Sequence, residues 1–435
     1  MSHPNSHPDP APIGPHTIRR FTLDNGIRLI VQENHTSPSV VLRGHVWAGS
    51  VSEPSDRLGL ADFTASAVRR GSTTRTFQEV NELIETVGAS VFIGAGRRLT
   101  RFGGKSLTED LGLLVDVLSD LLLHPAFDAL ELEKLRGQVI THLREMENNT
   151  RGLAEREFRQ ILYSAEHPYG RPVDGTLETV PRISRADVQA FYTDHYHPDG
   201  ACLVVVGDVQ AEAVCELLNA RLGNWQPVGA PEDFVLPPIP ALTAPQRTVH
   251  TLTNKTQVDI VLGTVGPARN APDIYAARVA DTILGHLGLM GRLGDRVRDQ
   301  LGMAYYAYST LEAGLGPGPW SVSAGVAPEN LPGAIEAILA EISRLRDEPV
   351  SASEIEDAQD YLTGVLPLRL ESNEGIAGTL LDIELYQLGD DYIMRYPDII
   401  RAVTAADVQA AARQYLDAEH YALAIAGPWT DSQGG

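Results

Sequence analysis

Three features are scarce in this sequence: cysteine, long apolar runs and positive charge. Only Cys202 and Cys215 occur among 435 residues, which excludes a disulfide-rich scaffold and is typical of a reducing cytoplasm. The longest apolar runs, such as CLVVV at 202–206, are too short to span a bilayer. The N-terminus, MSHPNSHPDPAPIGPH, lacks the basic start and apolar core of a signal peptide. We therefore predict a cytoplasmic protein with a flexible, proline-rich leader at residues 1–15.

The deficit of positive charge restricts the partners of the chain. Lysine and arginine together number 35 and aspartate and glutamate 57, which gives a formal net charge of −22. Such a surface repels nucleic acids and anionic membranes. It would attract a cationic partner or peptide, or it only keeps the protein soluble.

The chain contains an internal repeat. At 435 residues it is too long for one ordinary core. Residues 184–208 align with 404–428 without a gap, and the pentapeptide ADVQA occurs at the same place in both. Both segments open with a hydroxyl residue, Ser184 or Thr404, three positions before an aspartate, which is the pattern of a helix N-cap. This repeat predicts a duplicated domain.

A proline-rich stretch separates the two copies. Residues 226–246 contain six prolines and no helical period, so we predict a semi-rigid linker there. The predicted domains are therefore 16–225 and 247–430. Each half alternates short strands with long amphipathic helices. The predicted fold class is α+β, with two homologous domains that each contain a mainly antiparallel sheet covered by helices.

Several long phrases carry a family resemblance. FTLDNGIRLIVQENHTSPSVVLRGHVWAGSVSEPSDRLGLADF at 21–63 and RLGDRVRDQLGMAYYAYS at 292–309 are two of them. They resemble the pitrilysin/insulinase family of zinc peptidases, in its two-domain, processing-peptidase-like branch. The resemblance covers nearly the whole chain after about residue 16. It implies that the chain forms one half of a closing clamshell.

The zinc motif of that family is degenerate here. The resemblance implies a His-x-x-Glu-His motif after Gly-x-Ala and a later glutamate ligand, because zinc needs three protein ligands and a base for its water. The motif positions are occupied by Asp62, Ala65 and Ser66, and the later glutamate falls at Thr141 or His142. Asp62 or His142 could each contact a metal, but neither has a second partner at helical spacing. The sequence therefore predicts no zinc in this chain.

A second element of the family is retained in the C-terminal half. The resemblance implies that an arginine and a tyrosine at Arg298 and Tyr305 approach a bound peptide, the tyrosine as a donor to the carbonyl oxygen that gains charge. Alternatively, Arg298 pairs with a surface carboxylate and Tyr305 packs in the sheet. Arg292 and Arg296 compete for the arginine role. Two neighbouring tyrosines are predicted to be ordinary strand residues: Tyr306 and Tyr308.

The resemblance also implies a peptide-docking strand. The segment ASVFIGAG at 89–96 corresponds to an edge strand that pairs with substrate through its backbone. Its candidate contact residues are Phe92, Gly94, Ala95 and Gly96. The glycines would admit a close peptide backbone, or they mark a bulge.

These observations predict the zinc-free subunit of a heterodimeric zinc peptidase. The chain would supply Arg298 and Tyr305 to a homologous, zinc-bearing partner and would be inactive alone. The substrate would be a peptide or an unfolded segment. The alternatives are a structural scaffold and a homodimer that binds peptides without cleaving them.

Overall fold

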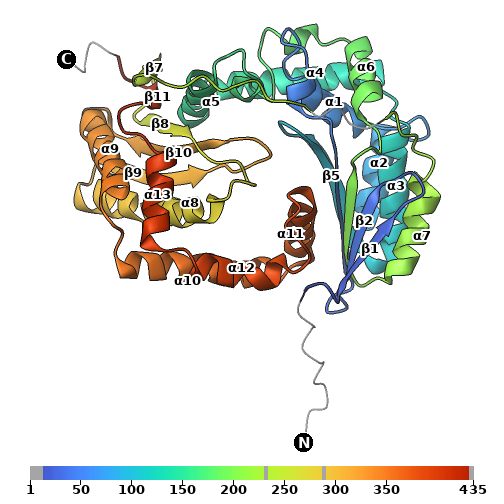
Figure 1. The fold of residues 1–435 in the computed structure, drawn as a ribbon. Helices are drawn as coiled ribbons and strands as arrows, with labels where there is room; N and C mark the ends of the chain where they lie inside the picture. The colour runs from blue at the N-terminus through green and yellow to red at the C-terminus, as the bar shows by residue number, and fades with distance from the viewer. Residues whose placement is uncertain (1–12, 230–233, 287–290, 431–435) are drawn as a thin grey trace, which may run out of the picture.

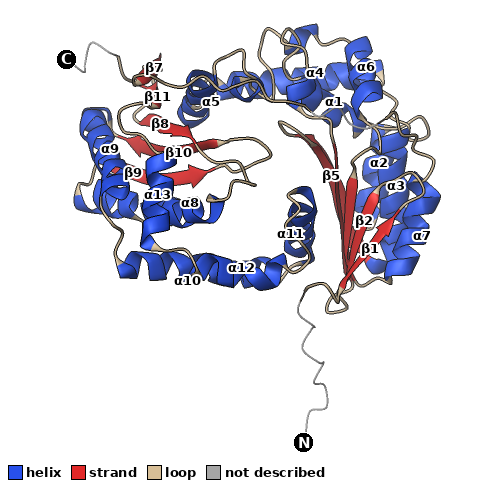
Figure 2. Cartoon of the chain, in the orientation of Figure 1, coloured by secondary structure: helices blue, strands red, loops and turns tan. Residues whose placement is uncertain are grey.

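The computed structural model describes residues 13–229, 234–286 and 291–430. Of the predicted leader at 1–15, residues 1–12 lie outside the described residues, as do residues 230–233 of the predicted linker. The described chain forms two sheets that lie in different parts of the molecule (Figures 1 and 2).

The first sheet has six strands in the order β1-β2-β6-β3-β5-β4. Its strands are β1 (Ile18–Thr22), β2 (Arg28–Glu33), β3 (Ser39–Val46), β4 (Ser90–Ala95), β5 (Thr100–Leu107) and β6 (Cys202–Gly207). Helices α1, α2, α3, α4, α6 and α7 cover its outer face (Figure 2). Their bounds are α1 (Leu60–Val68), α2 (Phe77–Thr86), α3 (Leu111–Leu123), α4 (Ala129–Met146), α6 (Arg185–His195) and α7 (Ala211–Leu222).

The second sheet has five strands in the order β7-β11-β8-β10-β9. Its strands are β7 (Gln246–Thr251), β8 (Val258–Val265), β9 (Ala304–Leu311), β10 (Pro319–Val326) and β11 (Ala422–Gly427). The helices on its side of the molecule include α8 (Ile274–Asp281), α9 (Leu331–Asp347), α10 (Ala352–Arg369), α12 (Tyr392–Arg401) and α13 (Ala405–Tyr415).

The two sheets share one topology. Strands β2, β6, β3, β5 and β4 follow one another as β7, β11, β8, β10 and β9 do in the second sheet. In each sheet one pair is parallel, β2 with β6 and β7 with β11, and the other described pairs are antiparallel. The repeated helices α6 and α13 both begin with a capping box, at Ser184 and Thr404. The predicted α+β fold with two homologous, mainly antiparallel sheets is confirmed.

Each half donates one helix to the sheet of the other half. Helix α5 (Thr150–Tyr163) comes from the N-terminal half and packs on β8 and β11 of the second sheet. Helix α11 (Asn373–Leu385) comes from the C-terminal half and packs on β3 and β6 of the first sheet. Because these helices cover the inner faces, the halves are joined by apolar cores as well as by the chain. The domain boundaries read from the sequence stay a prediction, and they do not separate the two packing units.

Polar contacts fix α11 on the first sheet. Lys105 Nζ lies 2.5 Å from a carboxylate oxygen of Glu374, and Arg20 Nη1 lies 2.6 Å from one of Glu384. The Asn373 side-chain amide donates to the carbonyl oxygen of Ser39 (3.0 Å). These contacts hold the first and last turns of α11 against strands from the N-terminal half of the sequence.

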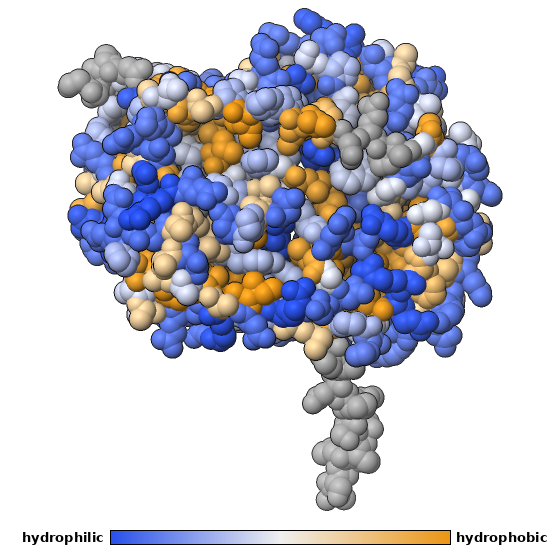
Figure 3. Space-filling model, viewed as in Figure 1, coloured by the Kyte–Doolittle hydropathy of each residue, from blue (hydrophilic) through white to orange (hydrophobic). Residues whose placement is uncertain are grey.

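The face shown in Figure 3 is mostly hydrophilic, with apolar residues in separate patches. Among the described residues, no helix has the length and apolar character needed to cross a membrane. The cytoplasmic location stays a prediction.

Candidate functional site

The helix that corresponds to the zinc-binding helix of the resembled family is α1, and a buried carboxylate holds its start. Gly59 precedes the helix with φ +91°, a conformation that favours glycine. The backbone N–H groups of Gly59 and Ala61 donate to the two carboxylate oxygens of Glu53, each at 3.1 Å. Burial raises the pKa of Glu53 to about 8, although both N–H donors act in the opposite direction. A side chain therefore fixes the N-terminus of this helix without help from a metal.

The ligand positions on α1 have mostly become packing positions. Ala65 is fully buried in the core of the first half, and Ser66 is half-buried. Burial raises the pKa of Asp62 to about 6, repulsion from Asp174 raises it further, and His142 lowers it. His142 on α4 is thus near enough to act electrostatically on Asp62, although its own side chain is exposed.

These residues do not fit a zinc site. Among the residues that the structure describes, no three histidine, cysteine, aspartate or glutamate side chains are grouped so that they could hold a metal ion. Ala65 has no ligand atom and no base, and a serine hydroxyl is a poor zinc ligand at neutral pH. Asp62 and His142 alone leave at least one protein ligand missing. No reaction step through a metal held by this chain follows from this geometry.

The Arg298/Tyr305 element is a tight turn between a helix and a strand. Arg298 lies in the π-helical segment η7 (Gly294–Gln300), and Tyr305 is the second residue of β9. Gly302, at φ +62°, donates its N–H to the Arg298 carbonyl oxygen (3.0 Å), and Met303 donates to that of Val297 (3.0 Å). The turn thus fixes the backbone distance between the two candidate residues.

A bulge at the start of β9 directs Tyr305 outward. In the pairing with β10, Tyr306 lies opposite Gly325 and Ala304 opposite Val326, so Tyr305 is the extra residue. A bulged residue leaves the alternation of its strand, and bulges often re-aim a side chain beside functional sites. Tyr305 is 64% exposed, and no described residue hydrogen-bonds to its hydroxyl or to the Arg298 guanidinium. The alternative in which Arg298 pairs with a carboxylate and Tyr305 packs in the sheet is not what the described residues show.

The competing arginines have other partners. Arg292 is buried and donates from Nε to Glu354 (2.6 Å), while Arg296 donates to the side chain of Gln300 (2.9 Å). These contacts leave Arg298 as the arginine of this element with an uncommitted side chain in the described structure. Its predicted role stays a prediction.

Tyr306 and Tyr308 are more than ordinary strand residues. The Tyr306 hydroxyl donates to Asp259 Oδ1 (2.5 Å), and the Arg151 guanidinium lies 5.2 Å from the centroid of each tyrosine ring. Thr150, at the start of α5, also donates to Asp259. This cluster ties the exchanged helix α5 to β8 and β9. We interpreted these two tyrosines as ordinary strand residues and did not predict this polar junction. The alternation of residues along the strand does not show which helix covers it.

The predicted docking segment is an edge strand. Strand β4 is last in the order of the first sheet and pairs with β5. Gly96 N–H donates to the Leu99 carbonyl oxygen (2.7 Å), so by the alternation of an antiparallel pair the backbone groups of Gly94 and Phe92 face β5. Those of Ala95 face the open edge. A peptide strand could therefore pair there, although the role of these residues stays a prediction.

The candidate residues lie in separate places. The Arg298/Tyr305 turn belongs to the second sheet, whereas α1 and β4 belong to the first. Figure 1 shows α1 and β9 in different halves of the molecule. Sequence reasoning also missed a group of arginines next to β4, although the dipeptide Arg97-Arg98 after three small residues was a visible signal.

Comparison with known proteins identifies the family. Residues 28–176 match the family model described as insulinase (peptidase family M16), and residues 182–362 match the one described as the peptidase M16 inactive domain. The chain belongs to the M16 peptidase family. The predicted resemblance to insulinase-like peptidases is therefore confirmed.

Relatives of this M16 chain include proteins named as peptidases. The uncharacterized zinc protease YmxG of Bacillus subtilis is 25% identical over 414 residues, covering 94% of this chain and 98% of YmxG. The mitochondrial-processing peptidase subunit beta of Saccharomyces cerevisiae is 24% identical over 374 residues, covering 82% and 80%. A crystal structure titled peptidase M16 inactive domain, from Pseudomonas fluorescens, has a TM-score of 0.88 at 22% identity, covering 95% and 98%, and supports the fold alone.

Proposed function

We propose that this M16 chain is the zinc-free subunit of a heterodimeric peptidase. The observation that carries the proposal is a contrast within one chain. The helix of the zinc motif has lost its ligands, while Tyr305 is exposed, Arg298 is half-buried, and neither side chain has a hydrogen-bond partner among the described residues. A homologous partner would hold the zinc, which supplies an activated water for peptide hydrolysis. The name of the yeast relative, a subunit of a processing peptidase, supports a role in an assembly.

In this proposal, the chain contributes binding and charge stabilisation. Tyr305 donates its hydroxyl proton in a hydrogen bond to the scissile carbonyl oxygen as that oxygen gains negative charge. Arg298 binds the peptide backbone, because a guanidinium offers several donors in a fixed plane. The open edge of β4 holds the extended peptide by backbone pairing. None of these steps needs a metal in this chain.

The test is steady-state peptide cleavage by the chain reconstituted with a homologue that has an intact His-x-x-Glu-His motif. Tyr305→Phe keeps the ring and removes one donor, so turnover should fall by about a hundredfold or more with a smaller change in KM. Arg298→Ala should lose more in KM. Full activity of Tyr305→Phe would remove this chain from the chemistry and leave a scaffold.

Tyr306→Phe changes the neighbouring tyrosine of β9, but it is an unsuitable control. Tyr306 carries a hydrogen bond to the buried Asp259, so this change alters stability. Tyr421→Phe is a better control, because no described residue hydrogen-bonds to its hydroxyl. Tyr421 directly precedes β11, and strands β8 and β10 separate β11 from β9 in the sheet. Its activity should equal that of the unmodified pair.

A second candidate is a homodimer that binds peptides without cleavage. The open edge of β4 and the absence of a zinc-ligand group among the described residues favour it. The two proposals differ in one measurement. Addition of a zinc-bearing homologue to the chain should create peptidase activity if the first proposal is right, and should leave it absent if the second is right.

A further inference from the structure

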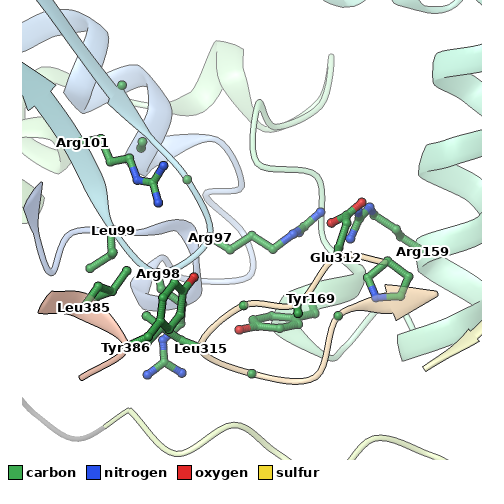
Figure 4. Close-up of a pocket in the computed structure, with 18 residues that line it drawn as sticks. Arg97, Arg98, Leu99, Arg101, Arg159, Tyr169, Glu312, Leu315, Leu385 and Tyr386 are labelled. Carbon is green, nitrogen blue, oxygen red and sulfur yellow. The ribbon is translucent and has the colours of Figure 1, made fainter. Parts of the chain in front are cut away.

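A cavity of about 580 Å³ lies where the end of β4 meets the second half of the chain. Its wall combines the β4–β5 turn, the glycine-rich segment between β9 and β10, and the C-terminal end of α11 (Figure 4). The cavity includes three residues of the predicted docking segment: Gly94, Ala95 and Gly96. It is therefore continuous with the edge at which we propose that a peptide pairs.

The wall of this cavity is cationic. Among the residues that line it, four are arginines and one is an acid: Arg97, Arg98, Arg101, Arg159 and Glu312. The whole chain, by contrast, has a net charge of −22. An excess of positive charge concentrated in one cavity of an acidic protein marks a local preference for an anion.

The five charges are unequally compensated. Arg159 donates to both Glu155 and Glu312, so its charge is paired. Figure 4 shows Arg97 extended toward this pair. Its recorded hydrogen bond is to the Arg171 carbonyl oxygen (2.9 Å), and no described carboxylate forms an ion pair with it. Burial and the neighbouring Arg159 lower the pKa of Arg97 to about 10.

The other two arginines, Arg98 and Arg101, differ in their exposure and contacts. Arg101 is half-exposed, and the carboxylate of Asp382 lies 3.6 Å from its guanidinium. At that distance in water, an ion pair contributes little and can be exchanged for another carboxylate. Arg98 lies over the rings of Trp47 and Phe234, with centroid distances of 5.9 and 5.4 Å, which restrict its position.

The opposite wall is a close-packed backbone segment. A Cβ atom on Gly318 would lie 1.7 Å from the Glu312 carbonyl oxygen, so only glycine fits at this turn. The segment at 312–319 thus brings Glu312 and Leu315 to the cavity. Leu99 and Leu385 add an apolar part to the wall. The cavity accordingly combines room for a peptide side chain with guanidinium groups that can pair with a carboxylate.

We propose that this cavity binds a carboxylate of the peptide that pairs with β4, from an acidic side chain or from the peptide C-terminus. The inference rests on the proposed function and adds a substrate class to it: peptides with an acidic group placed beyond the segment that pairs at Ala95. The overall negative charge does not oppose this preference. Screening limits the field of distant charges to about 8 Å at physiological salt, whereas the arginines act at contact distance.

The experiment measures peptide binding to the full-length chain by fluorescence anisotropy. The probes are extended peptides of about twelve residues, rich in Val, Thr, Ser and Gly, with a rhodamine label at the N-terminus. One has three consecutive glutamates and an amidated C-terminus, the second has glutamines in their place, and the third is the glutamine peptide with a free carboxylate. A charge-assisted pair should make the glutamate or the free-carboxylate peptide bind about tenfold more tightly than the neutral one, and this comparison identifies the source of the carboxylate.

Variants test the location. Arg101→Gln changes a half-exposed residue and should retain the fold, and Arg97→Gln removes the half-buried charge that has no carboxylate partner. Each should reduce the tenfold preference to about twofold or less. Glu312→Gln removes the competing carboxylate and should increase the preference. Arg182→Gln is the matched control, because Arg182 is exposed on the short helix at Val180–Arg182 and does not line the cavity.

Two kinds of failure can be distinguished with Ala95→Pro, which removes the backbone donor at the open edge and is compared with Ala95→Ser. Equal binding of acidic and neutral peptides, both weakened by Ala95→Pro, would overturn the cavity assignment alone. An acid preference that survives in both arginine variants would also overturn it. Binding of any probe that Ala95→Pro does not weaken, or no binding up to about 1 mM, would contradict peptide docking on β4 and with it that part of the proposed function.

Discussion

The stability of this protein should fall as the pH rises through the neutral range, because of Glu53. Its side chain is 4% exposed and receives the first backbone N–H groups of α1. Burial raises its pKa from 4.5 to about 8. The folded protein therefore binds a proton at Glu53 between these two values, while the unfolded chain has released it. The stabilisation from protonated Glu53 is fully present below the pKa of Glu53 in the unfolded chain. It is lost as the pH rises through the pKa of Glu53 in the folded protein.

The size of the effect follows from the two pKa values. Integration of the difference in bound protons from about pH 5 to about pH 8 gives about 3 kcal/mol for this one group. Asp62, with a pKa of about 6, adds a smaller loss of the same sign in the lower part of the range. The Glu53→Gln variant cannot ionise at this position. It keeps one acceptor for α1 and should be less stable at acidic pH, but its unfolding free energy should depend much less on pH.

Urea unfolding followed by tryptophan fluorescence at a series of pH values measures both proteins. The unfolding free energy of the unmodified protein minus that of Glu53→Gln should fall by about 3 kcal/mol from the acidic end to the alkaline end of the series. Asp110→Asn is a suitable control, since this carboxylate lies half-exposed at the start of α3 and caps no backbone group by its side chain. Parallel pH profiles for the unmodified protein and Glu53→Gln would show that Glu53 is ionised in the folded state and that the reasoning is wrong.

Two further predictions concern the lost metal site and the tyrosine junction. Elemental analysis of the purified chain should find less than about 0.1 zinc per molecule. His142→Ala should not change this metal content. A content of about one tightly held zinc that is lost in Asp62→Ala would contradict the prediction. Tyr306→Phe removes a hydrogen bond to the buried Asp259 and should lower the unfolding free energy by about 1–3 kcal/mol. An unchanged midpoint of urea unfolding would show that the other donors to Asp259 maintain the stability without this hydrogen bond.

The repeat made the architecture predictable from the sequence. The gapless alignment of 184–208 with 404–428 corresponds in the structure to α6 with β6 and α13 with β11, in one shared topology. The exchange of α5 and α11 was not predictable. Helix α5 has one apolar face, and α11 has buried residues around most of its circumference. Both patterns show that a helix is covered but not which sheet covers it.

For the candidate site, the sequence indicated which residues to consider, but it did not show how the fold exposes them or which charges lie nearby. The turn between Arg298 and Tyr305 follows from local signals, a glycine between a helix and a strand. The bulge that exposes Tyr305 depends on the register with β10 at Gly325, which no local pattern contains. The cationic cavity is formed by segments more than two hundred residues apart in the sequence, so its excess charge became visible only after folding.

In the proposed heterodimer, the exchanged helices α5 and α11 would also limit which parts of this chain can move. Separation of the two halves would pull α5 off the second sheet and expose side chains such as Phe158 and Leu162, which are 1% exposed. Each would cost about 1.5–3 kcal/mol, and α11 would add a similar penalty on the first sheet. Since the cavity at β4 is built from both halves and from the end of α11, its shape is tied to these cores. Opening of a complex to admit a peptide would therefore take place between subunits, with Arg298, Tyr305 and the β4 edge carried as parts of one rigid half.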